Sequence, residues 1–180
     1  MSSIQPNPEI EVIVSEAVKS AKELNHEYVS LEHLLKATVT FKPFNDLLVA
    51  FGCDVDSMVD DIETYLQGQT YLVSQETAHE PKKTHALERV FNRALTQVLF
   101  TGRRLVTPID LWLAIMNENN SHAHYYFLKF GLNKKEFVEF EKYHKNVYNI
   151  YFHVACGFVF MTFLFLLSND FYSFERFYFV

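Results

Sequence analysis

The histidines and cysteines are the side chains of this sequence best suited to bind a metal, and their spacing argues against such a site. The histidines in question form three pairs: His26 with His33, His79 with His85, and, in an expected loop, His122 with His124. A zinc site needs a compact set of three or four ligands. None of the pairs forms such a set with an acidic residue, and Cys53 and Cys156 stand alone. We therefore predict no metal and no other cofactor, and interpret the histidines as polar surface groups or hydrogen-bonded residues at helix starts.

Motifs for nucleotide binding and for nucleophilic catalysis are absent from the sequence. No Gly-x-x-x-x-Gly-Lys-Ser/Thr phosphate loop occurs, and the chain has only five glycines. The backbone N–H groups of such a loop are what cradle the phosphates of ATP. No Ser or Cys stands in a recognisable arrangement with a His and an acid. We therefore expect no ATP hydrolysis and no other catalytic activity.

Glu27 and Glu32 flank a short connector between two expected helices. Both carboxylates are predicted to lie at one end of the first half of the chain. On a structural interpretation, Glu32 complements the dipole at a helix N-terminus and Glu27 is solvated. On a functional interpretation, the two form part of a partner-binding surface. Residue type alone favours the structural interpretation.

A duplicated segment determines where these residues lie. Residues 29–37 align with residues 106–114 at an offset of 77, and residues 51–52 align with 130–131 at an offset of 79. A repeat of this length indicates two supersecondary units, each too small to bury its own apolar face, that pack against one another.

Each unit is predicted to be helical. Apolar residues recur every three or four positions from Ile10 to Leu24, which predicts one buried helix face. A second helix is expected to begin after Ser30 in the first unit and after Thr107 in the second, since both residues are good N-caps. Two shorter helices complete the first unit, over residues 44–51 and 55–66. The sequence therefore predicts an all-α fold of two pseudo-twofold-related four-helix repeats, followed by a C-terminal hydrophobic helix.

The expected organisation follows from these helices. It comprises an N-terminal arm (1–8), repeat 1 (9–67), an exposed linker (68–84), repeat 2 (85–145) and a hydrophobic tail (146–180). The linker contains Gly, Pro, Ser and charged residues without sustained periodicity. Leu111, Trp112 and Leu113 are expected in the core because the repeats align there.

Charge and cysteine content limit the class of protein. The chain has 180 residues and a formal net charge of −6, which argues against nucleic-acid binding. Two isolated cysteines suit a reducing compartment. The N-terminus has neither the basic start nor the apolar stretch of a secretory signal. We expect a cytoplasmic protein.

The sequence resembles the N-terminal repeat domain of Clp ATPases, most closely the ClpA type. The resemblance rests on the duplicated unit, on Ser30-Leu31-Glu32-His33-Leu34-Leu35 and on the run over residues 87–94. It covers roughly residues 9–145. In that family the domain is a receptor that precedes two AAA+ ATPase modules, and it binds substrates or, in ClpA-like members, the adaptor ClpS.

The resemblance also implies site residues. Glu27 and Glu32 match acidic residues on the adaptor-binding face of the family, and Thr84 and Arg89 match polar residues at the start of the second repeat. Opposite charges side by side would form an interface rim that sets partner orientation and association rate. A ClpC-type phosphoarginine site would need a Glu in both repeats, but the second position here is Ile109. The resemblance therefore favours the adaptor.

The tail suggests a membrane anchor. Residues 147–167 carry no charge and are almost wholly apolar, and a span needs about 20 helical residues. Lys142 and Lys145 precede this segment and would hold the repeats on the cytoplasmic side. Two other interpretations are an extra helix that covers a groove and a non-native extension.

Together these features predict a non-catalytic module that binds a ClpS-like adaptor or substrates of a Clp protease. The alternative is a membrane-tethered protein that holds a cytoplasmic partner through its repeats.

Overall fold

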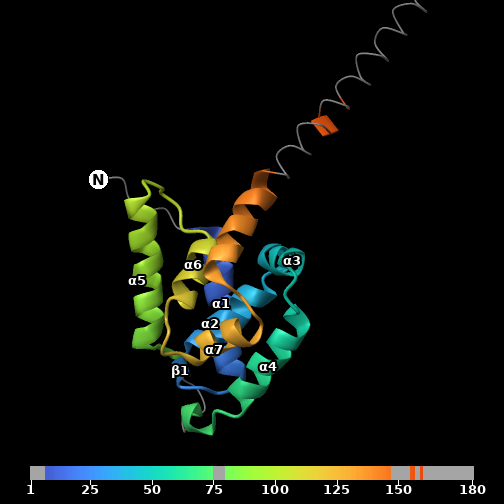
Figure 1. Cartoon of the computed structure of the whole chain (residues 1–180). Coiled ribbons are helices and arrows are strands. Elements are labelled where there is room, and N and C mark those ends of the chain that lie inside the picture. The colour runs from blue at the N-terminus through green and yellow to red at the C-terminus, as the bar shows by residue number, and fades with distance from the viewer. Residues whose placement is uncertain (1–6, 75–79, 147–154, 157–158, 160–180) are drawn as a thin grey trace, which may run out of the picture. The chain divides into compact units, whose positions relative to one another are not determined.

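The computed structural model describes residues 7–74, 80–146, 155–156 and 159 (Figure 1). Within these ranges the regular secondary structure is helical apart from two strands of two residues each and one isolated bridge between His26 and Val73, so the predicted all-α class is confirmed. Two compact units divide the chain, residues 1–137 and residues 138–180. The expected hydrophobic helix over 147–167 lies almost entirely outside the described residues. None of the described helices is both long and apolar enough to cross a membrane.

The helices occur in the predicted order. Repeat 1 contains α1 (Pro8–Glu23), α2 (Leu31–Thr40), α3 (Lys42–Phe51) and α4 (Val55–Gln67). Repeat 2 contains α5 (His85–Phe100), α6 (Pro108–Met116), α7 (His122–Lys129) and a helix over residues 134–146. The expectation of a loop at His122 and His124 is wrong, because Ser121 caps α7 and places both residues in its first turn.

Equivalent caps start the second helix of each repeat. The N–H of Thr107 donates to Oδ2 of Asp110 at 2.9 Å, and the N–H of Ser30 donates to Nδ1 of His33 at 3.1 Å. Each contact is one half of a capping box, in which the third helical residue reaches back to the N-cap. The predicted N-caps, Ser30 and Thr107, are therefore confirmed.

The core forms around α2 and α6. Eight of the ten residues of α2 and eight of the nine residues of α6 are buried, so both helices are enclosed on all sides. The two helices contact each other, and α2 also contacts α1, α3, α4, α5 and α7. Trp112 of α6 lies between Phe44 and Phe127, with ring centroids 5.0 and 4.7 Å away. Because these rings come from both repeats, the repeats share one core, and the predicted burial of residues 111–113 is confirmed.

The connector and the linker contain structure that the sequence did not predict. β1 (Tyr28–Val29) pairs in parallel with β2 (Lys82–Lys83), and a short 3₁₀ helix spans Thr70–Leu72. The N–H of Glu27 donates to the carbonyl of Leu72 at 2.7 Å. These contacts satisfy backbone groups that a free connector would leave to water. They also fix the end of the linker beside the connector of repeat 1.

Candidate protein-binding site

Glu27 directly precedes β1 and is half-buried. Its backbone carbonyl accepts a hydrogen bond from the N–H of Lys82 at 2.8 Å, and its carboxylate lies 3.2 Å from Nζ of Lys82. The Glu27 side chain is 42% exposed, so this ion pair contributes little to stability. The same ammonium group lies 5.9 Å from the ring centroid of Tyr28. The backbone therefore positions a carboxylate, an ammonium group and an aromatic ring together at the surface.

Thr84 joins the linker to the second repeat. Its hydroxyl donates to the carbonyl of Val29 at 3.2 Å and accepts the N–H of Leu87 at 3.3 Å, which caps α5. Both contacts are internal to the fold. Thr84 therefore fixes the position of the start of α5 relative to β1.

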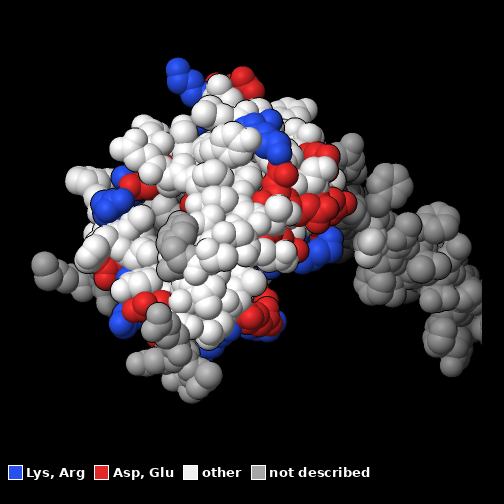
Figure 2. Space-filling model, turned by 90° about the horizontal axis from the view of Figure 1, so that it is seen from below, with Lys and Arg blue, Asp and Glu red and all other residues white. Residues whose placement is uncertain are grey.

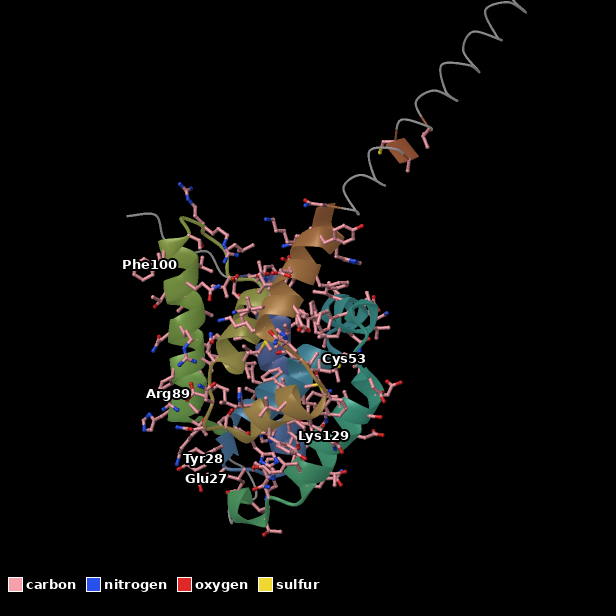
Figure 3. All side chains as sticks on the ribbon, in the orientation of Figure 1. Glu27, Tyr28, Cys53, Arg89, Phe100 and Lys129 are labelled. Carbon is pink, nitrogen blue, oxygen red and sulfur yellow. The ribbon has the colours of Figure 1, made fainter. Side chains whose placement is uncertain are left out.

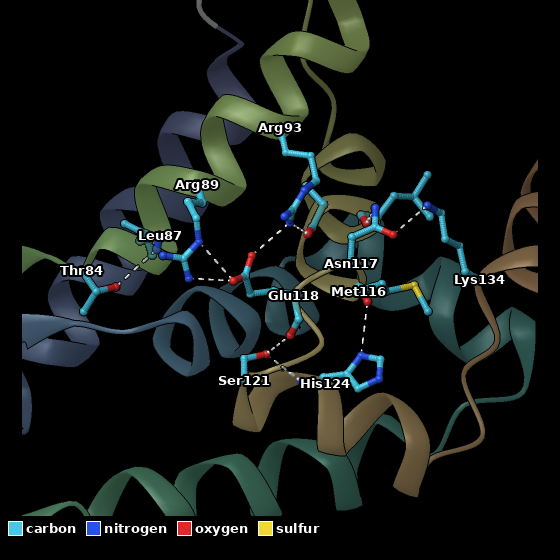
Figure 4. A network of polar contacts seen from close by, with 12 residues as sticks. Thr84, Leu87, Arg89, Arg93, Met116, Asn117, Glu118, Ser121, His124 and Lys134 are labelled. Carbon is cyan, nitrogen blue, oxygen red and sulfur yellow. Dashed lines mark hydrogen bonds and ion pairs between the residues drawn. The ribbon is translucent and has the colours of Figure 1, made fainter.

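Arg89 belongs to a polar network between α5 and the segment after α6 (Figure 4). Its Nε and Nη2 both donate to Oε1 of Glu118, at 3.2 and 2.7 Å. Arg93 donates to Oε2 of Glu118 at 3.1 Å and to the carbonyl of Ala114 at 3.0 Å. The hydrogen bonds from Arg89 lower the pKa of Glu118; burial opposes this shift and Arg93 adds to it. The network holds Arg89 in one orientation while its side chain stays 57% exposed.

Glu32 differs from the expectation of an exposed rim carboxylate. The residue is only 8% exposed, and its Oε1 accepts the N–H of Ala123 at 3.2 Å. Ala123 lies in the first turn of α7, where unpaired N–H groups attract an anion. Glu32 therefore connects repeat 1 to repeat 2 as a cap on another helix, which is why it is buried.

Three of the four residues expected at the site lie at one exposed end of the fold. Glu27 and Thr84 flank the β1–β2 pairing, and Arg89 follows Thr84 on α5. Figure 3 places Glu27, Tyr28 and Arg89 at the same end. We call Glu27, Thr84 and Arg89 the rim. Tyr28, Lys82 and Glu118 adjoin the rim. The sequence did not indicate them, because their positions depend on strand pairing and on a contact between distant segments.

Among the described residues, no metal centre accompanies the rim. Within the part of the chain that the structure describes, no group of three or more His, Cys, Asp or Glu side chains is arranged to hold a metal ion. The rim and the adjoining Tyr28 offer charges, hydrogen-bonding groups and one aromatic ring.

Known proteins resemble this chain in sequence. The family described as the Clp repeat (R) N-terminal domain matches residues 5–130. A "ClpA homolog protein" of Fuscovulum blasticum is 26% identical over 132 residues, which are 73% of this chain and 17% of that protein. The chain thus spans less than a fifth of the length of that relative.

Solved structures share the fold. The N-terminal domain of Candida albicans Hsp104 aligns with a TM-score of 0.64 at 13% identity, over 74% of this chain and 87% of that one. The N-terminal domain of Arabidopsis thaliana ClpD aligns with a TM-score of 0.57 at 15% identity, over 74% and 92%. At such identities the likeness concerns the fold alone.

Proposed function

Because the chain belongs to the Clp repeat N-terminal domain family, a non-catalytic protein-binding module of Clp ATPases, we propose that it binds a ClpS-like adaptor. Substrates of a Clp protease are the other partners that the proposal includes. The rim of Glu27, Thr84 and Arg89 is the proposed contact surface, and the proposed location is the cytoplasm.

The observation that carries the proposal is a pair of oriented ion pairs at the rim, Glu27 with Lys82 and Arg89 with Glu118. Backbone pairing holds Glu27 beside Lys82. Two hydrogen bonds to one carboxylate oxygen hold Arg89 beside Glu118. Side chains that are already oriented lose less entropy when a partner binds. Mixed charges around a surface mainly set the orientation of the partner and its association rate. Glu32 is buried against α7, so on this proposal it acts only through the position of that helix.

A charge reversal with a matched control tests the proposal. Glu27 and Glu16 both sit in exposed ion pairs with a lysine, with N–O distances of 3.2 and 3.0 Å. Glu27→Lys should weaken the binding of a purified ClpS-like adaptor about fivefold or more, as measured by titration calorimetry. Glu16→Lys makes the same change in net charge on α1 and should leave the affinity within about twofold. Equal effects of the two variants would refute the rim as the contact surface.

A second candidate function rests on the uncharged stretch over residues 147–167. On this proposal the repeats hold a partner at a membrane. Extraction of membranes with alkaline carbonate distinguishes the two proposals, because a spanning segment stays in the pellet and a peripheral protein is released.

A further inference from the structure

Two buried histidines join segments that lie far apart in the chain. Nδ1 of His26 lies 3.1 Å from Nε2 of His33, and both residues are buried. His33 lies in the first turn of α2. The backbone of His26 forms a β-bridge with Val73, which directly follows the 3₁₀ helix of the linker. The histidine pair therefore connects α2, the connector of repeat 1 and the start of the linker.

Hydrogen bonds on both sides of His26 complete this connection. We call the contact between residues 25–27 and residues 72–74 the linker contact. Two of its hydrogen bonds join Asn25 and Ser74, at 2.7 and 3.1 Å, and a third runs from the N–H of Glu27 to the 3₁₀ helix at 2.7 Å. The side chains of residues 72–74 are half-buried or exposed. A segment with so few buried apolar contacts opens more readily than the helices of the core.

Neither histidine can take up a proton without losing a hydrogen bond. The N–H of Ser30 donates to Nδ1 of His33 at 3.1 Å, so that nitrogen has no proton and Nε2 donates to His26. A proton added to Nδ1 of either ring would therefore face another N–H donor. Burial also removes the water that stabilises a charged imidazole.

The charged groups around the pair do not favour an imidazolium. Burial, and after it the neighbouring His26 and Lys36, lower the pKa of His33 to about 4. Glu32 of α2 accepts the N–H of Ala123. Among the described residues, the ion pairs of the connector, α4 and the end of α1 are Glu27 with Lys82, Glu63 with Lys36, Lys22 with Glu80, and Glu23 with Lys19. Figure 2 views the end where Figure 1 draws β1 and shows charged side chains around the edge of a broad uncharged zone. These carboxylates are thus already engaged, and Lys36 opposes a positive charge on His33.

We propose that the histidine pair is an acid-sensitive switch whose protonation opens the linker contact while the described helices stay folded. A charged His26 moves into water, and the residues on either side of it separate from the linker. Because Glu27 and β1 directly follow His26, opening also releases the fixed geometry of the rim. This effect on the rim rests on the proposed function, whereas the opening itself does not.

Amide hydrogen exchange of the full chain, followed by NMR at about pH 7.5 and about pH 5 in low concentrations of urea, tests the proposal. Protection factors correct for the intrinsic effect of pH on exchange. The amides of Glu27 and Ser74 donate across the linker contact and should lose protection about tenfold or more at the lower pH. Their exchange should depend little on urea, because a local opening exposes little surface. The amide of the buried Ile115 on α6 should show the full urea dependence of unfolding.

A double variant identifies the groups that titrate. His26→Gln combined with His33→Gln keeps hydrogen-bonding groups at both positions and cannot become charged, so protection at the linker contact should not change with pH. His85→Gln, at a position 95% exposed, should behave as the wild type. Circular dichroism verifies that each variant is folded. The wild-type measurement decides by itself if the double variant does not fold.

Three results would overturn the proposal. The first is constant protection of the Glu27 and Ser74 amides down to about pH 5. The second is a urea dependence of these amides equal to that of Ile115, since the contact would then open only when the whole fold unfolds. The third is an equal loss of protection in the double variant, which would assign the titration to another group. No adaptor enters these measurements, so their failure would leave the rim unaffected, and a failure of adaptor binding would leave the switch intact.

Discussion

Nε2 of His33 lies 3.1 Å from Nδ1 of His26, and both residues are buried. The N–H of Ser30 donates to Nδ1 of His33, so that nitrogen carries no proton and Nε2 must be the donor toward His26. Both rings are therefore neutral. In repeat 2, at the same spacing of seven residues, Arg103 forms two hydrogen bonds with Asp110. The same place in the duplicated fold thus holds a neutral pair in one repeat and an ion pair in the other.

The histidine pair predicts a loss of stability in mild acid. Burial, together with smaller effects of His26 and Lys36, lowers the pKa of His33 from 6.5 to about 4. Because the folded-state pKa lies below the unfolded value, the stabilisation is complete above pH 6.5 and is lost as pH falls toward 4. A shift of this size corresponds to at most about 3 kcal/mol. Urea unfolding at a series of pH values measures the effect.

Variants identify the group that titrates. His33→Gln keeps an acceptor for the Ser30 N–H and a donor for His26 and cannot become charged, so it should reduce the slope of the stability curve between pH 6.5 and 4. A smaller slope remains because burial also lowers the pKa of His26. His85→Gln replaces a histidine whose side chain is 95% exposed and should leave the curve unchanged. An unchanged slope in His33→Gln would refute the assignment. Asp110 does not titrate between pH 6.5 and 4. Burial alone would raise its pKa, but hydrogen bonds from Arg103 and Thr107 hold the pKa below 3.8.

Glu32 provides a test of the contact between the repeats. Glu32→Ala removes the acceptor of the Ala123 N–H and should lower the free energy of unfolding by about 1–3 kcal/mol. Glu32→Gln retains an acceptor and should cost less. Glu11→Ala, at an exposed position, should cost under about 0.5 kcal/mol. If Glu32→Ala were as stable as Glu11→Ala, the cap on α7 would have no energetic role. Glu32→Lys would confound folding with binding and is a poor probe of the partner surface.

The network around Glu118 predicts coupling between Arg89 and Glu118. Glu118→Ala leaves both Arg89 and Arg93 without their shared acceptor and should cost about 1–2 kcal/mol. Arg89→Ala should cost less than about 1 kcal/mol, because this side chain is 57% exposed. In a double-mutant cycle by urea unfolding, the double variant should lose less stability than the sum of the losses of the two single variants. Strictly additive losses would show that the two hydrogen bonds to Oε1 do not persist in solution.

Local features of the fold could be predicted from the sequence. Ser30 and Thr107 cap their helices through contacts within three residues, so the cap types alone located the helix starts. Gly52 likewise ends α3 with a φ of 95°, a conformation that costs glycine little. The strand pairing could not be predicted, because Tyr28 and Lys82 are far apart in the chain and two-residue strands leave no alternating pattern.

The candidate site was predictable only in part. Glu27 and Thr84 are half-buried in connecting segments, and Arg89 is exposed on α5. Glu32 appeared equivalent to Glu27, but its partner, Ala123, lies 91 residues away in the other repeat. Burial caused by contacts between repeats leaves no local signal in the sequence. For the same reason, nothing in the sequence singled out Glu118.

Hydrogen–deuterium exchange of the full chain, with and without a saturating ClpS-like adaptor, tests the central claim most directly. The adaptor should slow exchange at the amides of residues 27–29 and 82–89, which carry and surround the rim, and should leave α3 unchanged. Protection restricted to other parts of the fold would contradict the rim as the contact surface. Unaltered exchange throughout the chain, at adaptor concentrations that saturate an established Clp ATPase, would contradict the adaptor-binding function itself.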